Sequence, residues 1–355
     1  MKVCIIGDGL VSLALAKVLI QKDISVDILS SGKLKKYDNN RTLGISRSNI
    51  KYFNEKIVNI EKILWRIKNI KVYSENLPNR EILNFSNNNE QVFSVIKNQQ
   101  LYQILTQSLK KNKLIKFIKV FDNRKYNLII NCNPNHKITK KFFSNKVKKK
   151  YYSHAYTTII KHERVNANNT AIQIFTKNGP IAFLPMSEDK TSVVYSFIKN
   201  DFNSKEDIKN LIIKFNPIYK INKIEECSKF EINFSSLRNY YKNNILAFGD
   251  LLHQIHPLAG QGFNMSLRDI AQLSKLIDDK INIGLELDSS ICLDFQKKIQ
   301  NQNLFFSLGI DWIYELFKFE NYINTNLISK SANIIGKNKF MNTLFKKFAD
   351  NGLRV

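Results

Sequence analysis

The stretch Phe248–Asp269 reads FGDLLHQIHPLAGQGFNMSLRD, and it decides the fold. An apolar strand ends at Gly249-Asp250, and a loop holding Pro257, Gly260 and Gly262 then opens a helical pattern. Glycines just before a helix N-terminus let backbone N–H groups approach a bound anionic group closely, and the helix dipole adds positive potential. We therefore expect this loop to contact a ligand through its backbone.

A second glycine loop lies near the N-terminus. Lys2–Ile6 predicts a short apolar strand, Gly7-Asp8-Gly9 turns it, Leu10–Gln21 has helical spacing, and Ser25–Leu29 predicts a second strand. In this β-α-β arrangement the pyrophosphate of a dinucleotide rests on the helix N-terminus. Glycine is scarce, at 12 of 355 residues, and five of the twelve lie in the two loops, which indicates two places where a ligand touches backbone.

Two positions depart from the usual dinucleotide pattern. Ser12 stands at the third glycine position, where a small residue still allows helix–strand packing. Ser30 stands where an acid normally binds ribose hydroxyls, and Asp27 comes two or three residues too early on the strand. The adenosine end of the site is therefore less well specified than the loop at Gly260.

Composition excludes several classes of protein. The net charge of +25 comes from lysine, since only nine of the 55 basic residues are arginine, the residue preferred for reading phosphate and guanine. We expect a compositional bias, with no nucleic-acid partner, and attraction to an anionic membrane surface as the weaker alternative. The four cysteines are far apart and fit a reducing cytoplasm, and no stretch is long and apolar enough to span a bilayer.

The rest of the chain divides into regions of different character. A helix-rich, Lys- and Asn-rich segment follows the first loop, with Ser94–Leu109 the clearest helix. Successive strands then predict an antiparallel sheet, and after about residue 295 the chain is helical. For the amphipathic stretch Leu304–Phe319, packing on its own domain and contact with a bilayer both remain open. The predicted strands are Tyr126–Cys132, Tyr151–His162, Ala171–Phe175, Ile181–Leu184, Thr191–Ile198 and Ile245–Phe248.

Histidines and cysteines give no metal site. His253 and His256 are three residues apart, but no carboxylate or third histidine has a spacing that would complete a metal site. We expect both to make local hydrogen bonds, and Cys132 and Cys292 to be buried small apolar residues.

With both glycine loops, the chain resembles the FAD-dependent aromatic hydroxylases, and most closely their ubiquinone-biosynthesis branch. The motif at His256–Asp269, HPLAGQGFNMSLRD, carries most of the resemblance, together with Gly179–Pro185 and Arg41–Ser46. The resemblance implies an α/β fold, with a Rossmann-like FAD-binding domain interwoven with an antiparallel-sheet substrate domain and a helical C-terminal region. The expected bounds are 1–75, 95–150 and 235–295 for the FAD-binding domain, 76–94 and 151–234 for the substrate domain, and 296–355 for the helical region.

The resemblance also implies an FAD site. The first loop would hold the pyrophosphate, and the helix at Gly260 would face the reduced flavin ring. Asp250 is suited to accept hydrogen bonds from the ribityl hydroxyls, and Arg41 to pair with the pyrophosphate. The candidate cofactor-binding residues are Gly7, Gly9, Leu10, Val11, Ser12, Arg41, Gln99, Gly249, Asp250, Pro257, Gly260, Gln261, Gly262, Phe263 and Asn264. No side chain stands out as a general base, so no catalytic residue is assigned.

One departure concerns the reductant. The family usually has an Asp-Gly pair after the strand matching Asn127–Ile130, whereas this chain has Asn133-Pro134. Proline lacks an N–H and fixes φ, so it cannot copy a glycine turn. NAD(P)H and a separate electron donor both remain open as the reductant.

The implied activity is hydroxylation of a polyprenylated phenol in ubiquinone biosynthesis, with dioxygen, through a flavin hydroperoxide. The protein would be cytoplasmic or peripheral on the inner face of the membrane, where it would join a quinone-biosynthesis complex. Two alternatives stay open, a non-catalytic FAD-fold component of such a complex and a flavin-dependent isoprenoid reductase. Ring position, tail length and oligomeric state do not follow from the sequence.

Overall fold

A computed structural model describes residues 1–30, 40–78, 80–86, 90–197 and 205–353. Its helices are α1 (Leu10–Ile20), α2 (Arg47–Lys56), α3 (Asn98–Lys110), α4 (Lys137–Phe142), α5 (Lys205–Lys214), α6 (Gln261–Asn282), α7 (Ser290–Tyr322), α8 (Leu327–Lys337) and α9 (Lys339–Asn351), with short 3-10 helices η1 (Glu61–Ile63), η2 (Asn123–Lys125), η3 (Gly249–Leu251) and η4 (Leu258–Gly260).

A six-stranded sheet of order β16-β17-β9-β1-β2-β8 forms the first layer. All of its pairs are parallel except the β16–β17 hairpin. The strand β17 is reached only after residue 240, so a late segment completes the sheet that the N-terminus begins, as predicted. The strands are β1 (Lys2–Ile6), β2 (Ser25–Leu29), β8 (Ile115–Ile118), β9 (Leu128–Asn131), β16 (Tyr241–Lys242) and β17 (Ile245–Ala247).

A nine-stranded sheet forms the second layer, in the order β18-β15-β10-β13-β12-β11-β5-β6 with β14 beside β10. Its pairs are antiparallel, as expected, except that β11 runs parallel to β5. The strands are β5 (Asn69–Ser74), β6 (Glu81–Ser86), β10 (Lys146–His162), β11 (Thr170–Thr176), β12 (Gly179–Pro185), β13 (Lys190–Phe197), β14 (Ile221–Ile224), β15 (Ser228–Leu237) and β18 (His253–Gln254). Residue 198, the predicted end of one strand, lies outside the described residues.

One prediction is wrong for the Lys- and Asn-rich segment that follows the first loop. That segment is not helix-rich, because the described part of residues 42–97 holds five strands and one α-helix: β3 (Thr42–Ser46), β4 (Trp65–Ile67), β5, β6 and β7 (Phe93–Lys97) accompany α2. The predicted helix Ser94–Leu109 loses its first four residues to β7, which pairs with β3 and β4 in a small sheet. Those partners are distant in sequence, so local helical spacing did not reveal the strand.

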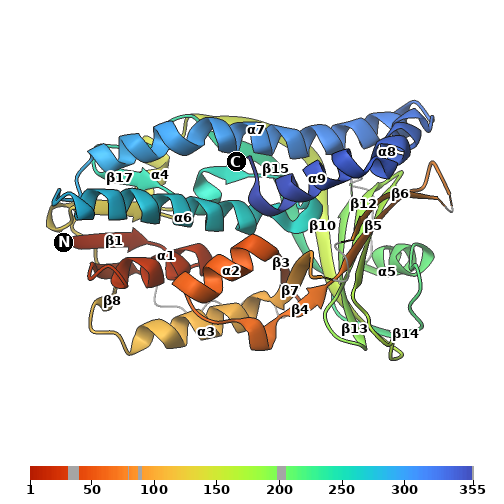
Figure 1. Ribbon diagram of the computed structural model, residues 1–355, viewed down its shortest axis with the longest axis horizontal. Coiled ribbons are helices and arrows are strands. Elements are labelled where there is room, and N and C mark those ends of the chain that lie inside the picture. The colour runs from red at the N-terminus through yellow and green to blue at the C-terminus, as the bar shows by residue number, and fades with distance from the viewer. Residues whose placement is uncertain (31–39, 79, 87–89, 198–204, 354–355) are drawn as a thin grey trace.

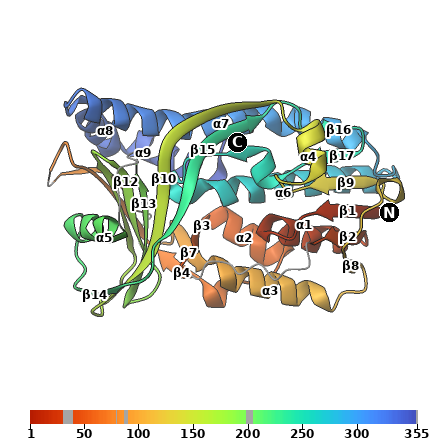
Figure 2. The same cartoon turned by 180° about the vertical axis from the view of Figure 1, so that it is seen from behind.

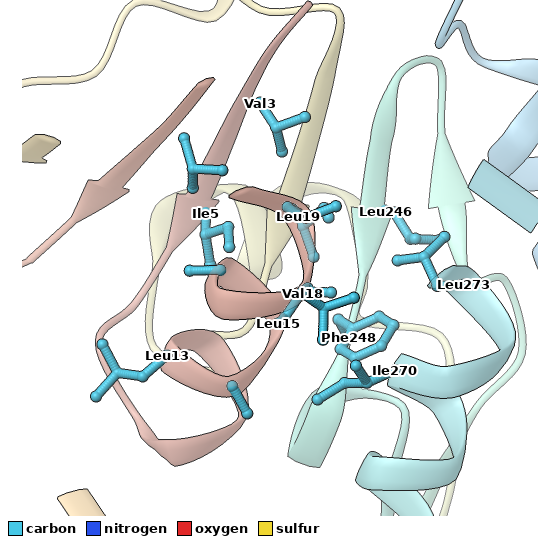
Figure 3. Packing of buried hydrophobic residues seen from close by; sticks show 14 of the residues in the cluster. Val3, Ile5, Leu13, Leu15, Val18, Leu19, Leu246, Phe248, Ile270 and Leu273 are labelled. Atoms are coloured by element: carbon cyan, nitrogen blue, oxygen red, sulfur yellow. The ribbon is translucent and has the colours of Figure 1, made fainter. Parts of the chain in front are cut away.

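The largest core lies around α1. Val3 and Ile5 of β1, Val18 of α1, Phe248 after β17 and Ile270 of α6 belong to one buried cluster, drawn in Figure 3. Helix α1 is apolar on nearly every side, since nine of its eleven residues are buried between the sheet and its neighbouring helices. This packing fixes the N-terminus of α1 relative to the loop that follows β17.

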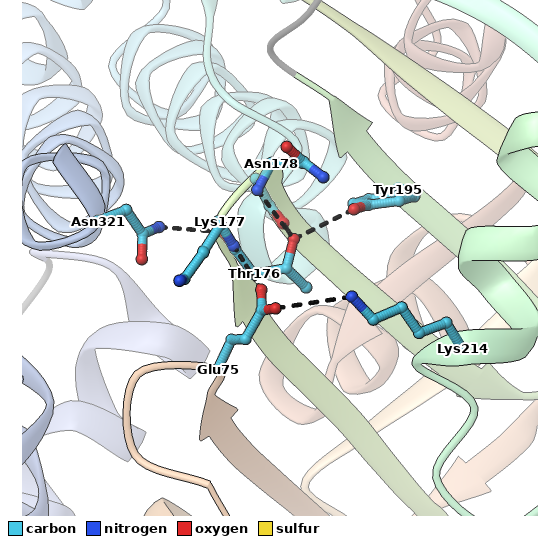
Figure 4. Close-up of polar contacts among 8 residues, drawn as sticks. Glu75, Thr176, Lys177, Asn178, Tyr195, Lys214 and Asn321 are labelled. Carbon is cyan, nitrogen blue, oxygen red and sulfur yellow. Dashed lines mark hydrogen bonds and ion pairs between the residues drawn. The ribbon is translucent and has the colours of Figure 1, made fainter. Parts of the chain in front are cut away.

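The long helix α7 runs along one side of the molecule across both layers (Figures 1 and 2). Helix α5 covers the face of the nine-stranded sheet that is turned away from the six-stranded sheet, through Ile208 and Ile212. A polar cluster joins the end of α7 to the nine-stranded sheet (Figure 4). Glu75 accepts a hydrogen bond from the Lys177 backbone N–H at 2.8 Å, and Asn321 of α7 donates one to the Thr176 carbonyl at 3.0 Å.

Candidate functional site

Four neighbouring parallel strands end at one edge of the six-stranded sheet. β17, β9, β1 and β2 are consecutive in it, and they lead into the segments at Gly249, Cys132, Gly7 and Ser30. Ligands of open α/β sheets bind at such a carboxyl edge, where the strand order switches. The two glycine loops that the sequence singled out therefore belong to one site.

Two glycines in these loops have a backbone conformation that favours glycine, and one of them is also closely packed. Gly249 has φ +64°, and a Cβ there would lie 3.1 Å from Cγ1 of Val11 on α1. Gly7 has φ +108°, and its Cβ would lie 3.5 Å from Cβ of Asn133. Positive φ favours glycine at both positions, and the 3.1 Å distance at Gly249 also leaves little room for a side chain. The second loop is thus packed directly against the helix that the first loop opens.

Two other glycines border open space. A Cβ added at Gly9 or Gly262 would meet no atom within 4 Å. Gly9 is the N-cap of α1 and Gly260 that of α6, no side chain in the described part of the chain caps either helix, and neither first turn holds an acid. The first-turn N–H groups and dipoles of both helices can therefore hold anionic groups. These loops fit the pyrophosphate and the flavin ring of FAD.

Asn264 joins the loop that runs from Gly249 to Gly262, which we call the flavin-side loop, to the Arg41–Ser46 segment. Its Oδ1 accepts from the Ser46 backbone N–H and from Asn49 Nδ2, both at 2.9 Å, and its Nδ2 donates to the Gly44 carbonyl at 2.9 Å. Because both ends of the amide bind protein groups, Asn264 can contribute to a ligand through its backbone and through the strand that it positions.

The remaining candidates occupy different surroundings. Arg41 is exposed, and its guanidinium lies 5.3 Å from the ring centroid of Phe230. Gln99, in the first turn of α3, is half-buried and lines a surface cavity of about 360 Å³. Gln261 is buried and donates to the Ala349 carbonyl of α9 at 3.1 Å. Leu10 and Phe263 are buried, and Pro257 is half-buried before η4. The structure brings the glycine-loop candidates together, whereas Arg41 packs against the nine-stranded sheet.

Ser12, Cys132 and Asp250 come from three separate segments and lie close enough to interact. Desolvation raises the pKa of the Cys132 thiol to about 12, the Ser12 hydroxyl opposes this, and the Asp250 carboxylate adds to it. The thiol therefore stays protonated at neutral pH. Cys132 is half-buried rather than fully buried as expected, and Cys292 is fully buried. Asp250 itself is exposed at the strand end, where a ligand hydroxyl could reach it.

Asp8, a carboxylate outside the predicted set of site residues, lies beside Ser30 at the end of β2. The Ser30 hydroxyl donates to Asp8 Oδ2 at 2.6 Å, and Asp8 is only 5% exposed. Asp27, in contrast, binds Lys2 and the Tyr126 hydroxyl, both at 2.8 Å, away from the end of its strand. The signal for Asp8 was its place between two glycines. Asp8 thus brings an acid to the end of β2, where residue 30 lacks one.

The expectation that both loop histidines make local hydrogen bonds is confirmed for His253 and wrong for His256, whose two ring nitrogens have no hydrogen-bond partner in the described part of the chain. His253 Nε2 lies 2.8 Å from Asp269 Oδ2, and Asn303 of α7 donates to the same carboxylate at 3.1 Å. His256 is stacked on Tyr314 with ring centroids 4.1 Å apart, and burial lowers its pKa to about 3. Within the described ranges, no three His, Cys, Asp or Glu side chains form a group that could hold a metal ion.

Comparison with known proteins agrees with the fold. A family model described as an FAD binding domain matches residues 199–282, which include the flavin-side loop. The p-nitrophenol 4-monooxygenase PnpA of Pseudomonas putida superposes with a TM-score of 0.80 at 12% identity, over 99% of this chain and 98% of that one. Klebsiella pneumoniae HpxO, complexed with FAD and uric acid, gives 0.77 at 11% identity, over 99% of this chain and 97% of that one. The chain therefore shares the fold of these solved structures, and the family model that matches residues 199–282 is that of an FAD binding domain.

Among sequence relatives, the similarity is to ubiquinone-biosynthesis hydroxylases. The ubiquinone biosynthesis monooxygenase COQ6 of Xenopus tropicalis is 24% identical over 208 residues, 47% of this chain and 45% of that protein. The ubiquinone hydroxylase UbiL of Rhodospirillum rubrum is 24% identical over 176 residues, 47% of this chain and 41% of that protein. The chain thus spans about half the length of these relatives. The predicted resemblance to this branch is confirmed at low identity.

Proposed function

We propose that this protein is an FAD-dependent monooxygenase that hydroxylates the aromatic ring of a polyprenylated phenol in ubiquinone biosynthesis. The observation that carries the proposal is the pair of glycine-bordered helix N-termini without a side-chain cap, at α1 and α6, which belong to the two loops that Gly249 and Val11 bring into contact. FAD, when bound, supplies the activation of dioxygen and the transfer of one oxygen atom to the ring. The second oxygen leaves as water, with two electrons from NAD(P)H or a separate donor.

The protein's own part is binding, orientation and exclusion of water. The N-terminus of α1 would hold the pyrophosphate, and Asp250 the ribityl hydroxyls. The N-terminus of α6, at Gly260, would stabilise negative charge on the reduced ring. Asn264 would hold β3 (Thr42–Ser46) beside that ring, through its bonds to Gly44 and Ser46.

We also propose that Asp8 takes the place of the missing ribose-binding acid. The hydrogen bond from Ser30 places the Asp8 carboxylate beside the end of β2. A carboxylate in this place can accept hydrogen bonds from ribose hydroxyls. The variant Asp8→Asn keeps the size of the side chain but weakens acceptance, so FAD affinity should fall by about tenfold. Asp23→Asn, in the turn after α1, is the matched control. Equal FAD dissociation constants for the two variants would assign Asp8 to the fold alone.

The substrate and setting follow from the named relatives and stay proposals. A polyprenylated phenol is held in a membrane, so the protein would work at the membrane surface and beside other quinone-biosynthesis proteins. Among the described residues, no helix is long and apolar enough to cross a membrane. We keep the domain division predicted above as a working proposal.

One experiment separates this proposal from its two alternatives. The protein is purified and its flavin absorbance recorded, and the gene is expressed in strains that each lack one quinone hydroxylase. We expect a yellow protein and a restored intermediate whose mass has grown by one oxygen atom. A colourless protein without restoration would favour the non-catalytic component. A product that gains two hydrogen atoms and no oxygen would favour the isoprenoid reductase.

A further inference from the structure

The outward face of α7 is apolar and uncovered. Phe305 is 64% exposed, Trp312 65%, Leu316 45% and Phe319 56%, and Tyr322 follows at the end of the helix. Their spacing of seven, four, three and three residues places them along one side of the helix. From Phe305 to Phe319 this stripe is about 21 Å long, at 1.5 Å per residue. We call these five side chains the α7 stripe.

The opposite face of α7 is firmly attached to the protein. Asp311 accepts from the Tyr151 hydroxyl at 2.6 Å and from Lys149 Nζ at 2.9 Å, which ties the helix to β10. Asn303 reaches Asp269 of α6, and Asn321 reaches Thr176 of β11 (Figure 4). These bonds fix the orientation of α7 on the protein. The α7 stripe is therefore the outward face of a helix that is already docked. A helix that is apolar on both faces needs a cover on each.

The exposed charges on the C-terminal part of α7 and on the two helices that follow it, α8 and α9, have one sign. Between residues 305 and 349, all of which the structure describes, the acids are Asp311, Glu315 and Glu320, and none of the three is exposed. Asp311 and Glu315 both pair with Lys149, while Glu320 is buried. The same region exposes four lysines, namely Lys330, Lys337, Lys339 and Lys347. Such a surface complements a negatively charged layer.

We propose that the α7 stripe is the surface through which this protein lies on an anionic lipid bilayer. Aromatic side chains on an amphipathic helix enter the boundary between headgroups and acyl chains, and nearby lysines bind anionic headgroups. A second copy of this chain fits less well, because symmetric contact would place lysines against lysines.

The stripe also lies close to the proposed chemistry. On the inner side of α7, Ile310 and Phe317 share a cluster with Leu258 of η4, in the flavin-side loop. A membrane-held substrate would therefore need to pass only the thickness of this helix to reach that loop. The inference builds on the proposed function in this respect, but lipid binding can be measured without cofactor or turnover.

The test is sedimentation of the full chain with phosphatidylcholine vesicles, made with and without a minority of phosphatidylglycerol. We expect binding to the anionic vesicles that weakens as salt rises. The double variant Trp312→Ser/Phe319→Ser should lower the partition coefficient at least tenfold, since each large apolar side chain contributes about that factor when buried. Its thermal midpoint should stay unchanged, because both side chains are exposed.

The matched control is Ile218→Ser/Ile283→Ser, which removes two side chains of 61% and 71% exposure elsewhere on the surface. It should bind vesicles like the unaltered chain. Absence of binding to anionic vesicles, or equal binding by the two double variants, would overturn the proposal. So would a dimer in light scattering that only the Trp312→Ser/Phe319→Ser change dissociates, since that result would assign the stripe to a second copy. Each of these results can be obtained without turnover, so failure of the membrane proposal is distinguishable from failure of the proposed hydroxylase activity.

Discussion

Replacing Gly249 by alanine tests how tightly the two glycine loops are packed together. Gly249 follows β17 closely, with φ +64°, and an added Cβ would lie 3.1 Å from Cγ1 of Val11. The chain also offers a matched glycine, Gly284 after α6, which has φ +72° but would meet no atom within 4 Å. Both substitutions impose the same backbone strain, and only the first adds crowding.

The expected cost can be built up from these two parts. A left-handed backbone costs an L-residue about 1–2 kcal/mol, and the stiffer unfolded chain returns about 0.4–1 kcal/mol. Gly284→Ala should therefore destabilise the protein by about 1 kcal/mol. Gly249→Ala adds overpacking against Val11, at about 1–3 kcal/mol, for a total of about 2–4 kcal/mol. At about 2 °C per kcal/mol for a long chain, its thermal midpoint should fall by about 4–8 °C.

The assay is thermal unfolding of both variants, followed by FAD titration of each. Gly249→Ala should also weaken FAD binding, because a shift of its loop moves Asp250. Adding Val11→Ala should recover the crowding part of the loss but not the strain. Equal midpoints for Gly249→Ala and Gly284→Ala would refute the close packing of the two loops.

Three further predictions concern single side chains. Asp250→Ala should lower FAD content in a folded protein, whereas Asp279→Ala, another exposed acid, should retain it; unchanged flavin in the first variant would remove the ribityl assignment. Burial holds the pKa of His256 at about 3, below about 6.5 in the unfolded chain, so the unfolded state binds more protons between these values. Stability should fall by about 1.4 kcal/mol per pH unit as pH drops from about 6.5 toward 3, and His256→Phe should flatten that part of a denaturation series. Tyr151→Phe removes a hydrogen bond to a carboxylate and should cost about 1.5–3 kcal/mol, while Tyr152→Phe, 72% exposed, should stay within about 0.5 kcal/mol in the same unfolding assay.

Elements with a local signal could be predicted from the sequence. β1 and β2 have the predicted bounds, and α1 ends one residue before the predicted end. These elements could be predicted because an apolar run and a glycine turn are patterns of neighbouring residues. β7 was missed, since Phe93–Lys97 becomes a strand only by pairing with β3 and β4. Such pairing joins residues far apart in sequence, and no local pattern contains it.

The same limit applies to the site. The sequence could predict that Gly7, Gly249 and Gly260 lie in segments between a strand and a helix. Each of these segments is short, and the pattern of the strand and the helix beside it is local. The bond between Asp8 and Ser30 joins residues 22 apart and required the structure. The amphipathic stretch at Leu304–Phe319 could be seen in the sequence, but only the folded chain shows which of its faces is exposed.

The protonated thiol of Cys132 has a consequence for chemical durability. Flavins that activate dioxygen release hydrogen peroxide when water reaches them, and thiolates are the form of cysteine that peroxide attacks. Cys132 borders the strand ends where that cofactor is expected, and its pKa of about 12 leaves almost no thiolate at neutral pH. Burial raises the pKa of Cys4 and Cys292 to about 12 as well. These three thiols therefore stay in the protonated form, which hydrogen peroxide attacks more slowly than the thiolate.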